Sequence, residues 1–504
     1  MNKKVIVIGG GIAGLSAGIY AQKCGFDVTI LESHFLPGGN CTSWKRGNYL
    51  FEGGMHWLTG SNPKEQVNSM WRCTGALTDD VEISYFEPFG VYDHNGTQIR
   101  LYRDVDKTEK HFLELSPEDE KEIKKFCNNI RKVKNLSMPV TDVKGVKVTK
   151  KSRPPLSMLT SAMSAINLIK SFAKVSREEY AKKFVHEGLQ ELIRAMTDDK
   201  TGIAPFIFTM GSLARGDGGF PEGGSLPFAK RMADMFTGLG GKIEYETRAD
   251  RVIIENNKVA GVMIKKVKSF AEASDNERID ADAVIVTADT MAINHLFDSP
   301  PKAKWLDEMR SNAKPTMVTF ISLGINADLN NYPHYGIFKL KDEIKLADQT
   351  YDYLSTNNYA SDPVYSPQGK TAMTIQLSGD TYDFWKKAKE DGTYEEEKQK
   401  IADAVINAIA VKMPETDGKI EVCDVATPLT YERYCANWRG SWMTEMTPEM
   451  KIKTYPAVID GLSGVYFAGH RMMPPGGLPT AIMTARIAIQ HLCRETDTLF
   501  ISED

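Results

Sequence analysis

A glycine-rich turn near the start of the chain constrains the fold more than any other feature of the sequence. Residues 5–8 form an apolar run typical of a buried parallel strand, and the glycines of 9–14 follow directly, ahead of a helical pattern over 15–23. A second apolar run, 26–31, ends at Glu32, close to the spacing expected of the acid that binds a ribose hydroxyl. This order predicts a Rossmann-type dinucleotide site. Its predicted contacts are Gly9, Gly11, Ile12, Ala13, Gly14, Glu32 and Ser33.

A second glycine pair follows Glu32 and lets the backbone approach another phosphate or a ribityl chain. Together with segment 49–57 (Tyr-Leu-Phe-Glu-Gly-Gly-Met-His-Trp), it resembles the glutathione-reductase-type FAD proteins, and among them the phytoene desaturase, carotenoid isomerase and retinol saturase group. The resemblance implies FAD as the cofactor. Two positions depart from it, because Asn40 stands where many relatives carry Arg and Glu52 where they usually carry Asp. The contacts implied here are Gly38, Gly39, Asn40 and Thr42.

The resemblance returns at 220–226 and again at 464–481. In relatives the first of these blocks completes the FAD domain, with the backbone near Val252 beside the adenine. The second block aims a helix N-terminus at the flavin pyrimidine edge, where the positive end of the helix stabilises the negative charge of the reduced state. The contacts implied by these blocks are Val252, Gly469, His470, Gly477 and Leu478.

These separated matches to the family predict an α/β protein with a discontinuous Rossmann-like FAD-binding domain and an inserted α+β substrate domain. The FAD-binding domain is expected over 1–105, 215–295 and 456–504, and the substrate domain over 106–214 and 296–455. A chain of 504 residues is long enough for several cores, which agrees with this division.

Charge and cysteine content exclude several other classes of protein. The chain has 62 Lys and Arg against 66 Asp and Glu, so its formal charge of −4 gives no electrostatic reason for general nucleic-acid binding. Its seven cysteines are scattered, with no C-x-x-C pair, so no metal site is predicted and a reducing cytoplasm is expected. No apolar stretch is long enough to span a bilayer.

A basic stretch over 143–177 contains no acidic residue, and within it apolar residues recur at helical spacing over about 154–175. One interpretation is an amphipathic helix that makes peripheral contact with the inner face of a membrane, where it would admit an oily substrate. The other is a helix that faces the core of the substrate domain and carries solvated lysines.

Five side chains are candidates for the chemistry. His56 is the first, because it follows the FAD glycines closely and the pKa of a histidine lies near neutrality. Glu52 is expected to orient His56 or to contact the ribityl chain. For both, a purely structural hydrogen-bonding role is the alternative. Tyr431, Tyr434 and Trp438 lie in a segment that resembles the Thr-Pro-x-Thr block with which relatives line the site, and core packing is their alternative.

We expect an FAD-dependent oxidoreductase that acts on carbon–carbon bonds of an apolar polyene or lipid, such as a carotenoid or retinoid, by desaturation, saturation or cis/trans isomerisation. A flavin amine oxidase is the second interpretation, with Tyr434 and Trp438 as an aromatic cage. A fatty-acid hydratase with structural FAD and a flavin-free prenyl-lipid carrier are further alternatives, although the intact glycines argue against the carrier. Because no second dinucleotide motif is visible, a quinone, oxygen or another protein is expected as the electron partner. The oligomeric state stays open.

Overall fold

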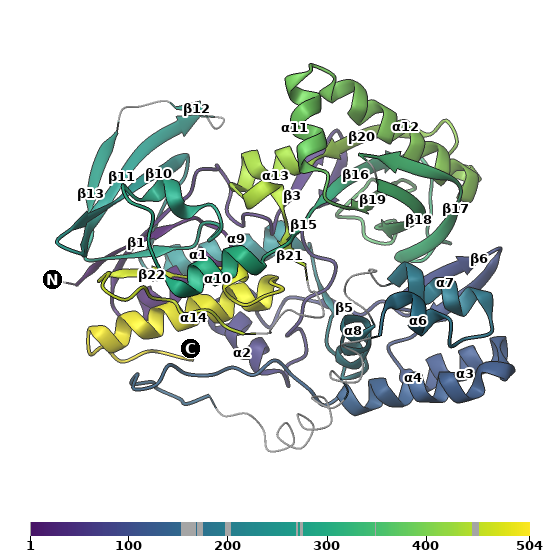
Figure 1. Cartoon of the computed structure of the whole chain (residues 1–504), viewed down its shortest axis with the longest axis horizontal. Coiled ribbons are helices and arrows are strands. Elements are labelled where there is room, and N and C mark those ends of the chain that lie inside the picture. Colours follow the sequence, from purple (N-terminus) through teal and green to yellow (C-terminus); the bar gives the residue numbers. More distant parts are fainter. Residues whose placement is uncertain are drawn as a thin grey trace.

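Two lobes, each built around its own sheet, make up the described part of the chain (Figure 1). The structure is a computed structural model that describes residues 2–152, 168, 175–196, 203–268, 271–272, 276–347, 349–445 and 453–503. In this part of the chain, no helix is both long and apolar enough to cross a membrane.

The first lobe is built on a parallel sheet whose strands come from distant parts of the sequence. Its strand order is β22 (Val465–Phe467), β14 (Ala283–Val286), β1 (Lys4–Ile8), β2 (Asp27–Leu31) and β9 (Lys242–Glu244). Val5 and Val7 of β1 pack in one core with helices α1 (Ile12–Lys23), α9 (Ser225–Gly238) and α14 (Leu478–Glu495). This is the Rossmann-like arrangement that the glycine turn predicts.

The other face of the parallel sheet is covered by a small antiparallel sheet and one helix. Ile6 and Ile8 pack in a second core with side chains of β10 (Thr247–Glu255), β11 (Lys258–Lys268) and α10 (Lys304–Asn312). Strands β12 (Ala271–Glu272) and β13 (Glu277–Asp280) pair with β11. Because successive side chains of a strand point to opposite faces, β1 contributes to both cores.

The second lobe is built on a larger, mostly antiparallel sheet. Its strand order is β20 (Ile420–Ala426), β16 (Val318–Ile325), β19 (Thr371–Ser378), β18 (Gln349–Asn358), β17 (Tyr335–Leu346), β6 (Gly90–His94) and β7 (Thr97–Leu101). On one face, Ile321 and Ile375 pack with Val405 of α12 (Tyr394–Lys412), which follows α11 (Tyr382–Glu390). On the other face, Phe320 packs with Trp44 of β3 (Ser43–Arg46), so this face is turned toward the first lobe.

A layer of helices covers the edge of this second sheet. Its members are α3 (Val105–Leu115), α4 (Glu120–Val133), α6 (Arg177–Ala181), α7 (Glu187–Met196) and α8 (Ala204–Ala214), which share a core with β6 and β7. Strands β6 and β7 precede residue 105, inside the segment predicted for the FAD-binding domain, yet they pair in the second sheet. The chain therefore enters the second lobe earlier than the predicted boundary.

The remaining elements of the described residues are short. They are β4 (Tyr49–Glu52), α2 (Gln66–Cys73), β5 (Ile83–Ser84), β8 (Phe220–Pro221), β15 (Pro315–Thr316), α13 (Pro428–Cys435), β21 (Met443–Thr444) and the 3-10 helices Pro117–Asp119, Ile293–Leu296, Pro414–Thr416, Trp438–Gly440 and His470–Met472.

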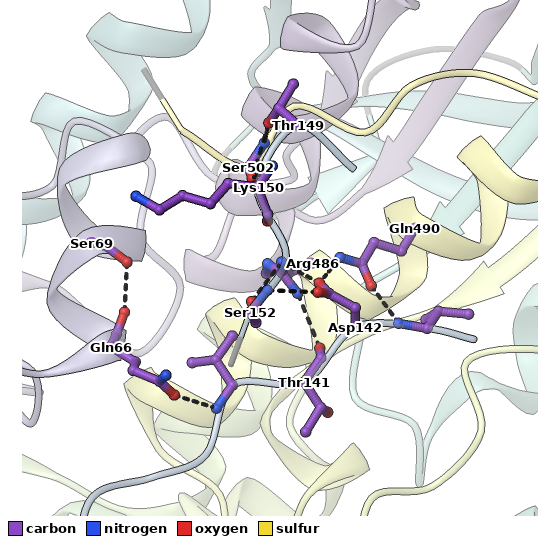
Figure 2. A network of polar contacts seen from close by, with 12 residues as sticks. Gln66, Ser69, Thr141, Asp142, Thr149, Lys150, Ser152, Arg486, Gln490 and Ser502 are labelled. Carbon is purple, nitrogen blue, oxygen red and sulfur yellow. Dashed lines mark hydrogen bonds and ion pairs between the residues drawn. The ribbon is translucent and has the colours of Figure 1, made fainter. Parts of the chain in front are cut away.

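Residues 138–152 form a strap that lies along α14 of the first lobe (Figure 2). Arg486 of α14 donates to the Asp142 carboxylate at 2.6 Å, and the Val143 N–H donates to the Gln490 side chain at 2.8 Å. The strap belongs to segment 106–214, which was predicted to lie in the substrate domain, but its contacts are with the first lobe. The predicted amphipathic helix over 154–175 lies outside the described residues apart from 168 and 175.

Candidate active site

The first glycine turn leaves no room for side chains where the strand meets the helix. A Cβ atom on Gly14 would lie 1.8 Å from the Gly9 carbonyl oxygen, so only glycine allows α1 to pack this close to β1. Gly9 has a φ of +103°, a backbone conformation that favours glycine. A Cβ on Gly11 would lie 3.8 Å from the Gly38 carbonyl oxygen, in ordinary contact, so a side chain there would occupy the space in front of the second glycine pair.

The second glycine pair lies directly against the first turn. The Gly38 N–H donates to the Gly10 carbonyl at 2.9 Å, and Gly11 pairs with Gly38 as an isolated parallel bridge. Gly38 and Gly39 have φ values of +117° and +60°. The two glycine segments, separate in sequence, therefore form one cradle of main chain at the carboxyl end of β1.

Two helices begin at this edge of the sheet without a capping side chain. No side chain caps α1 at Gly11 or α14 at Gly477, so these ends offer free N–H groups and the positive ends of their dipoles. Ile12, Ala13 and Leu478 are the first residues of these helices. Such ends bind phosphates and other anions.

Glu32 lies at the end of β2, as the spacing predicts. Its carboxylate accepts hydrogen bonds from the Gly10 N–H at 2.6 Å and the His34 N–H at 2.7 Å, and the Ser33 hydroxyl lies 3.4 Å away. Burial raises the pKa of Glu32 above its usual value. The acid is thus held beside the glycine cradle, where a ribose hydroxyl would replace part of its lost hydration.

The last strand and helix complete the same edge. The Gly469 N–H, just after β22, donates to the Thr484 hydroxyl of α14 at 3.1 Å, and burial lowers the pKa of the adjacent His470 to about 4. Val252 of β10 is buried in the core that contains β1 and β2. Asn40 accepts a hydrogen bond from the Asn437 side chain at 3.0 Å, and the Thr42 carbonyl accepts one from the Gly53 N–H at 3.1 Å.

This set fits FAD. The glycine cradle and the α1 N-terminus suit the pyrophosphate, Glu32 suits the ribose, and the uncapped α14 N-terminus suits the electron-rich edge of a flavin. All of these features lie at the carboxyl ends of parallel strands, where open α/β sheets bind cofactors. Among the described residues, no group of three or more His, Cys, Asp or Glu is placed to hold a metal ion.

His56 lies between the cofactor edge and the second lobe. The Gln376 side-chain nitrogen of β19 lies 2.5 Å from His56 Nε2, whereas His56 Nδ1 is buried with no hydrogen-bond partner among the described residues. When the amide donates to Nε2, the ring proton is on Nδ1. Burial lowers the pKa of His56 to about 4, so the ring is neutral at pH 7.

The buried carboxylate of Glu52 is hydrogen-bonded to groups of the protein. Its carboxylate accepts hydrogen bonds from the Gly54 and Met55 N–H groups at 2.9 Å each and from the Ser225 N–H at 2.8 Å, and the Ser225 hydroxyl also donates to it. Burial raises the pKa of Glu52. These contacts tie the turn that carries His56 to the start of α9, so Glu52 acts on His56 through the backbone.

The three aromatic candidates of the Thr-Pro-x-Thr block separate in space. Tyr431 is buried and meets Trp442 edge to face, with ring centroids 5.4 Å apart. Tyr434 is 37% exposed and contacts His34, near the ribose end of the cradle. Trp438 lies under the Arg471 guanidinium, 5.9 Å from the ring centroid.

Sequence reasoning missed three parts of the site. Gln376 had no motif to mark it. Trp442, in a Gly-Ser-Trp-Met stretch, stacks near His56 with ring centroids 6.4 Å apart, and Phe320 lies 5.7 Å from it. Arg471 and Asp289 form a buried ion pair at 2.8 Å. In the sequence, Asp289 and Arg471 both come shortly after predicted strands, and this is the signal that could have identified the pair.

Comparisons with known proteins place these features in a family. A family model described as flavin containing amine oxidoreductase matches residues 12–493. The prolycopene isomerase of Daucus carota is 24% identical, with 94% of this chain and 77% of the relative covered. The 4,4'-diapophytoene desaturase of Methylomonas sp is 23% identical over 98% and 96%, and the all-trans-retinol 13,14-reductase of Homo sapiens is 22% identical over 87% and 76%.

Solved structures show the same fold. An oxidoreductase from Methanosarcina mazei superposes with a TM-score of 0.57 at 17% identity, covering 96% of this chain and 98% of the other. Putrescine oxidase bound to putrescine gives 0.58 at 13% identity, with 99% of each chain covered. At these identities the likeness concerns the fold alone.

Proposed function

The chain belongs to the family of flavin-containing amine oxidoreductases, whose members are enzymes that use FAD, and from this premise we propose that it oxidises, reduces or isomerises carbon–carbon bonds of an apolar polyene such as a carotenoid or retinoid. The names of the relatives support this substrate class, because they include carotenoid desaturases, a carotenoid isomerase and a retinol reductase. FAD supplies the capacity to take up and return a hydride.

The observation that carries the proposal is an aromatic wall beside His56, which we define as Phe320, Tyr431 and Trp442. The three rings contact one another in series, at 5.7 Å and 5.4 Å between centroids. Flat aromatic surfaces suit an extended conjugated chain, which offers dispersion contacts and few hydrogen bonds. His56 is the polar exception beside this wall, and we propose that its Nδ1 proton is held toward the reacting atoms.

The other candidate residues have supporting parts in this proposal. Glu52 positions the His56 turn, and Gln376 fixes the orientation of the His56 ring. Cofactor contacts are assigned to the cradle, to Glu32 and to the α14 N-terminus. Since an apolar substrate is delivered from a lipid phase, a peripheral membrane contact of the helix expected near 154–175 belongs to the same proposal. The proposal also includes an electron partner, which is a quinone, oxygen or another protein.

Amine oxidation fits the site less well. Tyr434 is exposed beside His34, whereas Trp438 is covered by the Arg471 guanidinium, so these two rings have different neighbours and do not form the expected cage.

An anaerobic spectral titration tests the proposal. The FAD-loaded protein is mixed in its oxidised form and its reduced form with phytoene, all-trans-retinol and, as a control, putrescine. Bleaching of the oxidised flavin by a polyene, or reoxidation of the reduced flavin by one, is the expected result. Bleaching by putrescine alone would overturn the polyene proposal in favour of amine oxidation. If neither a polyene nor putrescine changes the flavin spectrum, the polyene proposal is also overturned, and FAD has a structural role.

A further inference from the structure

Three segments of the chain meet at one buried ion pair beside the cofactor edge. Arg471 Nε donates to both oxygens of Asp289 at 2.8 Å, and the two side chains are 1% and 2% exposed. Asp289 follows β14 and Arg471 follows β22, which are neighbouring parallel strands. Both charges therefore lie at the carboxyl end of the sheet, where the cofactor of such a fold binds.

The same two side chains also hold the loop 437–444, which carries Trp438 and Trp442. Arg471 Nη2 donates to the Ser441 hydroxyl at 2.6 Å and to the Ser441 carbonyl at 3.1 Å. The Asp289 carboxylate accepts a hydrogen bond from the Trp438 N–H at 2.9 Å. The pair thus connects the strand ends of the first lobe to the aromatic wall of the second.

We propose that Arg471 and Asp289 form a latch that fixes loop 437–444 over the cofactor edge and whose balanced charges set the redox potential of the flavin. Both are positioning residues, since they act through the loop and through the local field.

The two roles follow from different atoms of the pair. The hold on the loop needs the forked guanidinium, which reaches Asp289 and Ser441 at the same time, and a lysine ammonium lacks that planar fork. The electrostatic role needs opposite charges that cancel near the cofactor. Without the carboxylate, the positive charge of the arginine is no longer balanced and favours the reduced flavin, which carries more negative charge.

Two substitutions separate these roles. Asp289→Asn keeps an oxygen that accepts from the Trp438 N–H but removes the negative charge. We expect it to raise the flavin midpoint potential by about 30 mV, which is a tenfold change in the ratio of reduced to oxidised flavin for a two-electron couple. Arg471→Lys keeps the charge but loses the fork. We expect about tenfold faster amide exchange in 437–444, with the potential unchanged.

The matched control is a second Arg–Asp pair of the first lobe, Arg486 of α14 with Asp142, whose side chains are 3% and 17% exposed (Figure 2). Asp142→Asn makes the same chemical change and is expected to alter neither the potential nor exchange in 437–444. The measurements are a dye-coupled spectral titration of the FAD-loaded full chain and peptide-resolved hydrogen exchange.

Three results would overturn the latch. They are an unchanged potential in Asp289→Asn, unchanged loop exchange in Arg471→Lys, and an equal effect of Asp142→Asn on either quantity. Neither measurement uses a polyene, so failure of the proposed substrate class would leave this test intact. If Asp289→Asn does not bind FAD, the test rests on amide exchange in 437–444, compared between Arg471→Lys and Asp142→Asn. Equal exchange in these two variants would overturn the proposal.

Discussion

The cofactor edge of the first lobe and the aromatic wall of the second are built by different means. At the cofactor edge the main chain offers most of the groups that would hold FAD, through the glycine cradle and two uncapped helix N-termini. At the wall, side chains meet from distant parts of the sequence, as Gln376 meets His56 and Phe320 meets Trp442. The first region is therefore most sensitive to added atoms, and the second to removed side chains.

The largest effect is expected where an atom is added to the cofactor edge. In Gly14→Ala the new methyl group would lie 1.8 Å from the Gly9 carbonyl, so α1 must move away from β1. We expect FAD affinity to fall about a hundredfold or more, because overpacking by this amount costs several kcal/mol. The flavin-to-protein absorbance ratio of the purified protein measures it.

Gly238→Ala is the matched control for this change. No atom lies within 4 Å of a Cβ there, and the residue is helical in α9. Alanine should leave FAD binding unchanged and stabilise the protein by about 0.5–1 kcal/mol. Full FAD content in Gly14→Ala would show that the cradle is not the binding element.

A smaller effect is expected from removing a ring of the wall. Trp442→Leu should slow electron exchange with all-trans-retinol about tenfold while FAD content stays constant, because aromatic contacts contribute about 0.5–1.5 kcal/mol beyond area burial. Tyr434→Leu, on the exposed surface near His34, should change the rate by less than about twofold, as expected of a surface position. Stopped-flow spectroscopy of the flavin measures both. A larger loss of rate in Tyr434→Leu than in Trp442→Leu would mean that the substrate lies near Tyr434 and not along the aromatic wall.

The smallest effect concerns pH and spans both regions. Burial lowers the pKa of His470 at the cofactor edge, of His56 beside the wall and of His334 just before β17 from 6.5 to about 4. Above pH 6.5 these rings are neutral in both the folded and the unfolded state. Between pH 6.5 and 4 only the unfolded chain takes up the protons, so stability falls as the pH falls.

Melting temperatures at pH 7.5 and 5 measure this dependence. His56→Phe has one fewer titrating ring, so its melting temperature should fall less than that of the wild type over the same interval. An equal fall in both proteins would mean that His56 is already charged, or solvated, in the folded state.

The sequence predicted the cofactor edge in more detail than the wall. Gly9, Gly14 and Glu32 belong to one strand–turn–helix–strand unit, and their local spacing alone places them together. His56 could be named from its place after the FAD glycines, but its partner Gln376 could not, since β19 is far away in the chain. Tyr431 and Trp438 were chosen from one block. The chain leaves α13 through Ala436, with a φ of +52°, and the two rings have different neighbours.

By itself the sequence determined the Rossmann-like unit, the FAD cradle and the family, because these depend on short-range spacing and on backbone conformations that only glycine favours. The tertiary structure alone decided which side chains form the wall and the Arg471–Asp289 latch. A buried charge is stable only where an opposite charge and hydrogen-bond partners surround it. That condition is met by residues 182 positions apart, which only the pairing of β14 with β22 brings together.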